Sequence, residues 1–429
     1  MKSSFMTKTH HRTVSALACA LSVLLGSTSY AETDTSNSTL TEAARENRSQ
    51  LNFDGNIFAG PALDQLLAAA RNAQFFMIGE EHGIAENPKL VAQLFTTLIA
   101  DGYEKLAIEI SPPMAAIVDE VTKIDRIDGL RDLYASPGGE PAFFGMREEA
   151  ELLAAVRGAL PDAAEVFWGV DYEVAGDRPL LLQLRNMNRP VSSDQPLDNL
   201  IAASDASWAQ YEETGNPKFI FSFSGDPALV TALRDLWPDP DDEAAGILDT
   251  LQSTLEINRS WIQGRGWDSN AQRAALLRSS FLRHWHKAKK HGSTPKVMVK
   301  LGGNHVVRGR NMTATFDLGT LLPEIAAVEG SHSFSVLVLP GRDSMTAVLD
   351  PKSWTYVPKP AKDNYAKGIE VLTDAAYADA FTLIDLVALR PVIGSNNNQY
   401  DPAVTRVVHG FDMLLVMSGS TASSELQHD

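Results

Sequence analysis

The stretch that most constrains the fold is Phe75–Ile84, which reads FFMIGEEHGI. Its first half is a continuous apolar run, which is typical of a strand buried on both faces of a parallel sheet. Glu80, Glu81 and His82 follow that run directly. Burying three ionisable groups is costly unless they are paired, bound to a metal or used in catalysis. We therefore expect a central strand whose carboxyl end opens into a polar crevice.

Strands and helices alternate on both sides of this stretch. A helix is predicted over residues 87–102, because Pro88 lies in its first turn and Gly102 follows its last apolar residue. Further helices are predicted at 112–124 and 147–160, and further strands at 105–111, 165–171, 295–305, 333–341, 379–387 and 410–419. This alternation predicts an α/β fold with a mostly parallel central sheet flanked by helices.

The pattern becomes helical between residues 176 and 292, where FIFSFS (219–224) is the one stretch with a strand-like pattern. We expect a helical insertion that forms a lid over the carboxyl edge of the sheet. Residues 61–429 are predicted to form a single domain, since 429 residues are enough for one large core. The polar segment 32–60 is predicted to be loosely ordered.

Residues 1–31 have the pattern of a secretory signal peptide. Three basic residues precede an apolar stretch at 14–25, and Ser-Tyr-Ala at 29–31 is a small-x-small cleavage site. The apolar stretch is too short to span a bilayer, and no later stretch is long and apolar enough, so we expect no membrane insertion. The mature protein is predicted to be periplasmic or secreted, after cleavage near Ala31.

Charge and cysteine content narrow the function. The net charge at pH 7 is −17, and loss of the three basic residues of the leader makes it −20, which argues against nucleic acid and anionic membranes as partners. The single cysteine, Cys19, lies in the leader, so the mature chain has no thiolate nucleophile. A Gly-x-Ser-x-Gly nucleophile motif is absent as well. We expect a small-molecule substrate attacked directly by water; the sequence does not indicate an oligomeric state.

Four of the predicted strands end in polar side chains. Because the carboxyl ends of parallel strands lie at one edge of a sheet, these side chains should converge on one crevice. They are Glu80 and His82, Glu109, Asp171, and Asn304 with His305. Each alone could be a helix cap or a salt-bridge partner. Together, two imidazoles and several carboxylates favour either general acid–base work on water or a divalent metal site.

Two of these strand ends carry Gly-x-x-His, as Gly79–His82 and Gly302–His305, with Glu109 on the strand between them in sequence. This arrangement resembles the erythromycin esterase-like, ChaN-like and Tiki superfamily, which is marked by two such motifs and a glutamate on the second strand. The resemblance covers roughly residues 70–420. It implies an α/β fold and, for the esterase branch, a hydrolase.

Further stretches are similar to the esterase branch in particular. FFGMREEAELLAAVR resembles its Trp-x-x-Arg-x-x-Glu helix through Arg147 and either Glu149 or Glu151. FWGVDYE resembles its strand ending in Gly-x-Asp, here Asp171, and the helix that bears Arg273 resembles the one before the second histidine motif. In one departure, GEEHG is a residue shorter than the Gly-Glu-x-x-His-Gly of macrolide esterases. This departure argues against antibiotic lactones as substrates.

The function that we expect is activation of water for attack on an ester, lactone or related acyl bond, with no cofactor required. His82 would be the general base, oriented by Glu80 or Glu109, because an imidazole needs its second nitrogen held to present the right tautomer. His305 would polarise the carbonyl or stabilise the oxyanion. Substrate contacts are predicted for a further set of side chains, namely Arg147, Asp171, Arg273 and Asn304.

Two alternatives follow from the other branches of the resemblance. The Tiki branch implies a metal-dependent hydrolase or peptidase, in which Zn²⁺, Mn²⁺ or Co²⁺ would be held by Glu80, His82, Glu109 and His305. The ChaN branch implies a haem-binding protein. Axial ligands would then be sought in RHWHKAKKHG, at His284, His286 and His291, although these residues also suit the solvated last turn of an amphipathic helix.

Overall fold

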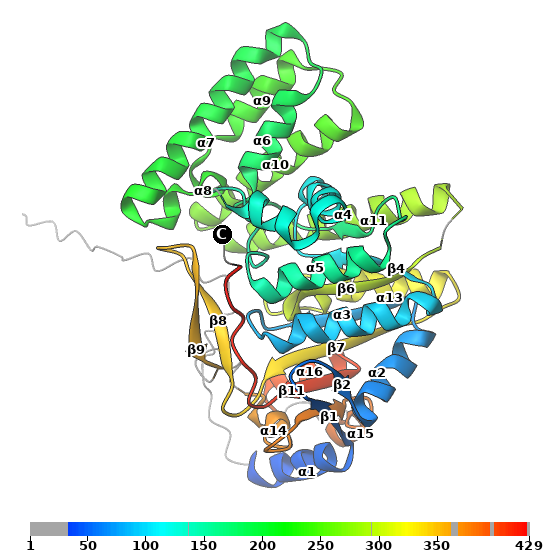
Figure 1. Ribbon diagram of the computed structural model, residues 1–429. Coiled ribbons are helices and arrows are strands. Elements are labelled where there is room, and N and C mark those ends of the chain that lie inside the picture. The colour runs from blue at the N-terminus through cyan, green and yellow to red at the C-terminus, as the bar shows by residue number, and fades with distance from the viewer. Residues whose placement is uncertain (1–32, 136, 293, 362–367, 395–398, 427–429) are drawn as a thin grey trace, which may run out of the picture.

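The computed structural model describes residues 33–426, apart from 136, 293, 362–367 and 395–398, so the predicted signal peptide lies outside the described residues. One sheet contains nine strands: β1 (Arg48–Phe53), β2 (Phe58–Ala59), β3 (Phe75–Glu80), β4 (Tyr103–Ile108), β5 (Phe167–Gly169), β6 (Lys296–Gly302), β7 (Ser333–Pro340), β10 (Phe381–Asp385) and β11 (Met413–Met417). Their order is β2-β1-β10-β11-β7-β3-β6-β4-β5, and the run from β11 to β5 is parallel. This confirms the predicted α/β fold with a mostly parallel sheet flanked by helices (Figure 1).

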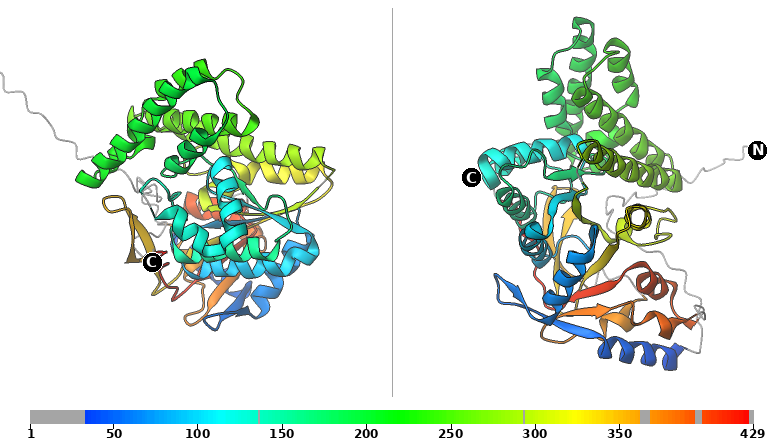
Figure 2. Two further views of the ribbon diagram at one scale, coloured as in Figure 1. Left: turned by 45° about the horizontal axis from the view of Figure 1, so that its top comes forward. Right: turned by 90° about the vertical axis from the view of Figure 1, so that its right-hand side faces the viewer.

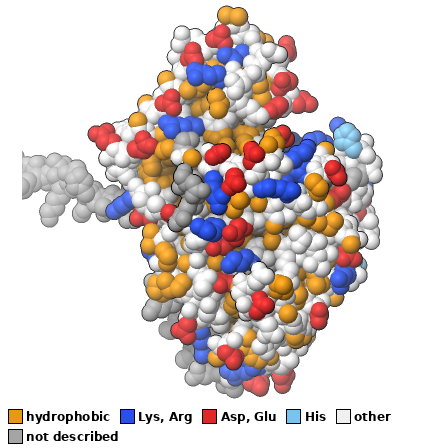
Figure 3. Space-filling model, in the orientation of Figure 1, with side chains coloured by type: hydrophobic (Ala, Val, Ile, Leu, Met, Phe, Trp, Pro, Cys, Tyr) orange, Lys and Arg blue, Asp and Glu red, His pale blue; other side chains and the backbone are white. Residues whose placement is uncertain are grey.

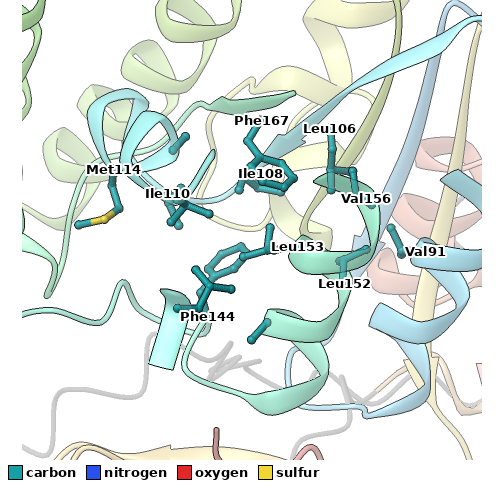
Figure 4. Packing of buried hydrophobic residues seen from close by; sticks show 14 of the residues in the cluster. Val91, Leu106, Ile108, Ile110, Met114, Phe144, Leu152, Leu153, Val156 and Phe167 are labelled. Carbon is teal, nitrogen blue, oxygen red and sulfur yellow. The ribbon is translucent and has the colours of Figure 1, made fainter. Parts of the chain in front are cut away.

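Helices cover both faces of this sheet. One face packs against α2 (Pro61–Asn72), α3 (Glu86–Leu98), α4 (Pro112–Tyr134) and α5 (Arg147–Ala159). The other packs against α1 (Thr33–Glu46), α11 (Gly266–Lys290), α13 (Leu318–Val328), α14 (Glu370–Thr373), α15 (Arg390–Ile393) and α16 (Pro402–Gly410). Figure 4 shows part of the first layer, in which Val156 of α5 lies beside Leu106 of β4 and Leu152 of α5 lies beside Val91 of α3.

Strand β3 shows why its sequence is apolar throughout. Successive side chains of a strand point to opposite faces, so Phe75 and Met77 enter the layer of α11, whereas Phe76 and Ile78 enter the layer of α3. The strand pairs in parallel with β6 on one side and with β7 on the other. It is therefore the centre of the sheet, as the continuous apolar run predicted.

The insertion between residues 176 and 292 is helical. It contains α6 (Asp177–Asn186), α7 (Asp194–Thr214), α8 (Phe221–Ser224), α9 (Pro227–Leu236) and α10 (Asp242–Ile262), followed by α11. The helices α6 to α10 form a lobe that projects beyond α4 at the top of Figure 1, and it stands out from the body of the molecule in Figures 2 and 3. Helix α11 returns to cover the sheet. The strand-like pattern at 219–224 was misleading, because Phe221 packs into the lobe's core as part of the short helix α8.

The lobe reaches the carboxyl side of the sheet through a hairpin formed by β8 (Met345–Asp350) and β9 (Thr355–Pro360). The Tyr211 hydroxyl of α7 donates to the carbonyl of Pro351, 3.0 Å away, and the Trp208 ring lies edge-on to Trp354 at 6.3 Å. The hairpin follows β7 directly in the chain. It therefore links the lobe to the strand ends where the candidate site was predicted.

The prediction of a loosely ordered segment at 32–60 is wrong for its described residues. Helix α1 buries Leu40 and Ala44, and β1 pairs antiparallel with β10 through four residue pairs. The segment has few apolar residues because β1 lies near the sheet edge and buries Leu51 alone. Among the described helices, none combines the length and apolarity needed to cross a bilayer.

Phe281 of α11 offers a direct test of this packing. The side chain is fully buried, and its ring lies edge-on to Phe75 and to Trp168, with 5.5 Å between centroids in both cases. Phe281→Ala is expected to lower the free energy of unfolding by about 3–5 kcal/mol, because it leaves a cavity beneath the sheet. Chemical denaturation measures this loss, and Val328→Ala, at an 85% exposed position, should change stability by less than about 0.5 kcal/mol.

Candidate functional site

Three neighbouring strands bring the predicted site residues together. Glu80 ends β3, Gly302 ends β6 directly opposite it, and Glu109 follows the last residue of β4. β4 and β6 end earlier than the sequence predicted, so Glu109 and His305 lie just past the paired residues, whereas β3 ends at Glu80 as predicted. His82 and His305 follow Glu80 and Gly302 at that edge. The convergence that parallel topology predicts is therefore observed for these residues.

Glu109 lies at the centre of the site. Its side chain is 6% exposed; Oε2 accepts from the backbone N–H of Gly302 at 2.6 Å, and Oε1 accepts from Nη2 of Arg273 at 2.8 Å. Nε2 of His82 lies 3.8 Å from Oε2, and Nε2 of His305 lies 3.5 Å from Oε1. Burial raises the pKa of Glu109, but His305, His82 and Arg273 outweigh it and lower that pKa to about 2. A carboxyl group with this pKa is ionised near neutral pH, where Glu109 places a negative charge beside both imidazoles.

Each imidazole is held from behind by a second carboxylate. Nδ1 of His82 lies 2.8 Å from Oε1 of Glu80, and Nδ1 of His305 lies 2.7 Å from Oδ2 of Asp317. Burial works to lower the pKa of both rings, but Glu80 and Glu109 raise the pKa of His82, and Glu109 and Asp317 raise that of His305. The carboxylates at Nδ1 fix the orientation of both rings, so that both Nε2 atoms lie near Glu109.

A buried lysine that the sequence analysis missed supports Glu80. Nζ of Lys300 is 2.6 Å from Oε1 of Glu80 and 2.7 Å from Oε1 of Glu149, and Asn87 donates to the other oxygen of Glu80. Burial raises the pKa of Glu80, but Lys300 and His82 outweigh burial and lower that pKa below its ordinary value. For Glu149 burial is the larger effect, and it raises the pKa to about 7. A lysine inside the apolar run KVMVKLG was the signal that could have revealed this pairing.

Glycines of the motifs are required by close approaches of the backbone. A Cβ on Gly79 would lie 2.3 Å from Val306, and one on Gly83 would lie 2.1 Å from the carbonyl oxygen of Ala347 in β8. Gly83 also has φ of +88°, which side-chain-bearing residues rarely adopt. The glycines on either side of Glu80 and His82 thus let α12 (Gly303–Val306) and the hairpin pack against the site.

The predicted substrate-binding residues have different positions. Arg273 reaches the site from α11, where its Nε donates to Oδ1 of Asp171 at 3.0 Å. Asn304 turns away, since its Oδ1 accepts from the backbone N–H of Met312 at 3.0 Å. Arg147 begins α5, and its buried Nε has no hydrogen-bond partner among the described residues. The structure thus joins Arg273 and Asp171 to Glu109, but not Asn304 or Arg147.

The donor set fits a metal ion poorly. Both oxygens of Glu109 are already bonded, one to the guanidinium of Arg273, whose positive charge would oppose a cation beside it. Glu80 is shared between Lys300 and His82. Throughout the part of the chain that the structure describes, no three His, Cys, Asp or Glu side chains are arranged to hold a metal.

The histidines considered for haem lie elsewhere, with His284 and His286 on α11 and His291 directly after it. His284 stacks on Trp168 at 5.2 Å between centroids, and its Nε2 bonds to the carbonyl of Gly169 at 3.0 Å. His286 and His291 are exposed. His284 is therefore engaged in packing α11 onto the sheet.

Similarity to known proteins was found by comparing structures, not sequences. No family model matches the sequence, and no curated protein matches it. A succinoglycan biosynthesis protein superposes with a TM-score of 0.59 at 11% identity, and a Bacillus cereus protein with 0.54 at 12%; each match covers 91% of this chain and 99% of the other. A mutant of the erythromycin esterase EreC, in its open conformation, gives 0.52 at 15% identity over 85% of this chain and 95% of its own.

The chain has the erythromycin esterase-like fold. At such identities the likeness shows the fold alone, and it agrees with the resemblance carried by the two Gly-x-x-His motifs. In this erythromycin esterase-like fold, the motifs end two adjacent parallel strands, and the glutamate follows the next strand across the sheet.

Gly302 faces the space between the two imidazoles. A Cβ there would lie 3.3 Å from Nε2 of His82 and 3.4 Å from Oε2 of Glu109, while φ of −54° suits any residue. Gly302→Ala is expected to leave the free energy of unfolding within about 1 kcal/mol of wild type. Any activity that the wild type shows should fall about 100-fold, because the added methyl group occupies the space beside Nε2 of His82 that a substrate or water would need.

The matched control is Gly246→Ala in α10, where a Cβ would meet nothing within 4 Å. It should keep full activity in whichever assay is used for Gly302→Ala. Equal activity of Gly302→Ala and Gly246→Ala would contradict the assignment of this space as the reaction site.

Proposed function

We propose that this protein is an exported hydrolase that activates water for attack on an ester, lactone or related acyl bond of a small molecule. The observation that carries the proposal is the facing pair of imidazoles across Glu109, each with its Nδ1 held by a buried carboxylate. Two oriented imidazoles with pKa values above the ordinary 6.5 supply one base and one acid near neutral pH.

His82 suits the role of general base. Its side chain is 21% exposed, against 9% for His305, so it is the more accessible of the two rings. In its neutral form, Nε2 takes a proton from water as the water oxygen bonds to the carbonyl carbon. Glu80 stabilises the imidazolium that forms, because Nδ1–H of His82 donates to its carboxylate.

His305 suits the role of acid. As an imidazolium, its Nε2–H stabilises the negative charge that develops on the carbonyl oxygen. The tetrahedral intermediate then collapses: the bond from carbon to the leaving oxygen breaks, and that oxygen takes the proton held by His82. Asp317 keeps His305 oriented throughout, and Glu109 favours its charged form.

Arg273 supports this arrangement without contacting substrate in the proposal. Its guanidinium bonds to Asp171 and to Glu109 and lies 4.8 Å from the centroid of the Tyr172 ring. Its charge is therefore shared between two carboxylates. We propose that Arg273 holds Glu109 in position between the two histidines. Arg147, the other arginine predicted to contact substrate, has no role in the proposed mechanism.

Substitution of the histidines tests the assignment. His82→Ala and His305→Ala are each expected to lower kcat by about 10²- to 10⁴-fold on any ester, lactone or amide that a substrate screen identifies. His286→Ala, an exposed position on α11, is the matched control and should retain full turnover. Full turnover of both His82→Ala and His305→Ala would refute the proposed function. Loss of activity on chelation, restored by one metal, would instead favour the metal-dependent alternative.

The pH dependence follows from the same geometry. His82 must be neutral to act as a base, and its pKa is raised above 6.5, so kcat/KM should fall as the pH drops through a value above 6.5. His305 must be protonated, so kcat/KM should fall again at alkaline pH, which gives a bell-shaped profile. Glu80→Gln removes a group that raises the pKa of His82 and should move the acid limb to lower pH. An acid limb at the same pH in that variant would contradict the pairing.

A further inference from the structure

An aromatic side chain covers one face of the candidate base. The ring of Phe143 stacks on the imidazole of His82, with 4.1 Å between centroids and 8° between planes. Phe143 lies in the connection between α4 and α5, far from β3 in sequence. One face of the imidazole is therefore covered, and its Nδ1 is bonded to Glu80.

The backbone of Phe143 is held in an unfavourable conformation. Its φ is +70°, in the left-handed region that bulky residues avoid. A conformation of this kind persists only where the surroundings impose it, and such residues concentrate at functional sites. The question is therefore which contacts hold Phe143 in place.

Two contacts come from the hairpin and the loop itself. The N–H of Phe143 donates to the hydroxyl oxygen of Tyr356 in β9 at 2.9 Å, and that hydroxyl donates to Oε1 of Glu140 at 2.8 Å. Tyr356 is 6% exposed, so water has little access to either of these hydrogen bonds. The Glu140 carboxylate in turn fills the space beside Gly145, where a Cβ would lie within 2.1 Å of it.

The same hairpin also forms a hydrogen bond with the residue that follows His82. The N–H of Ala347 in β8 donates to the carbonyl of Gly83 at 2.9 Å. The hairpin thus bonds both to the residue after His82 and to the residue stacked on it. These contacts connect the hairpin, Phe143 and His82. The Phe143 ring lies on one face of the imidazole, and Gly302 lies beside its Nε2.

We propose that Phe143, held by Tyr356, is a specificity-determining residue that narrows the approach to His82 and admits acyl groups that are unbranched next to the carbonyl. The role in specificity rests on the proposed function, and the cover over His82 stands independently of it. An acyl group with branches at that carbon would meet the Phe143 ring on one side and the backbone at Gly302 on the other.

The cover is tested without a substrate, by the rate at which diethyl pyrocarbonate modifies His82 in the full chain, followed by peptide mass spectrometry. Phe143→Ala should raise that rate roughly three- to tenfold, the factor that one aromatic contact is worth. Tyr356→Phe should raise it about twofold or more, since it removes the hydroxyl that bonds to Phe143. Val357→Ala, at an exposed neighbouring position of the hairpin, should leave it unchanged.

The specificity is tested with 4-nitrophenyl acetate and 4-nitrophenyl pivalate. Phe143→Ala should raise kcat/KM for pivalate relative to acetate at least about tenfold, since pivalate adds three methyl groups and one added methylene in a confined pocket is already worth about tenfold or more. An unchanged modification rate in both Phe143→Ala and Tyr356→Phe would overturn the cover, and an unchanged ester ratio would overturn the specificity role. If wild type hydrolyses neither these esters nor any other acyl compound, the proposed function fails with the specificity role, and the modification rates still decide the cover.

Discussion

The site depends on one buried anion. Glu109 accepts from the backbone of β6, is bonded to Arg273 from α11, and faces both imidazoles. An isolated carboxylate at this depth would be neutral, because burial alone favours the protonated form. The charges around it reverse that preference, so Glu109 in turn keeps His82 and His305 readily protonated. Removing this one charge would leave two histidines and an arginine without the group that brings them together.

A second layer of buried charge makes this arrangement rigid. Lys300 bridges Glu80 and Glu149 beneath the site, and Asp317 holds His305 from the start of α13. Buried ion pairs add little net stability, because desolvation offsets their attraction, and apolar replacements are often as stable. We interpret this network as a device that fixes the orientation and charge of the two imidazoles. The lobe and hairpin then determine, through Phe143, how the base is approached.

The sequence predicted the sheet and the convergence of the site for a definite physical reason. Apolar runs such as the one in β3 report burial directly, and parallel topology places every strand end at one edge. Glu80, His82, Glu109 and His305 could be found in that way. Lys300 could have been noticed as a lysine inside an apolar run, but its pairing with Glu149 and the role of Phe143 could not be predicted, because they depend on distant segments. β1 was missed because a strand with one buried residue has no strong pattern.

The central claim is that the charge of Glu109 sets the state of both imidazoles. It is tested most directly by NMR titration of the histidine ring nitrogens in wild type and in Glu109→Gln, which keeps the shape of the side chain. The account predicts that the pKa values of His82 and His305 both fall in the variant. Unchanged pKa values for His82 and His305 in a folded Glu109→Gln protein would contradict it.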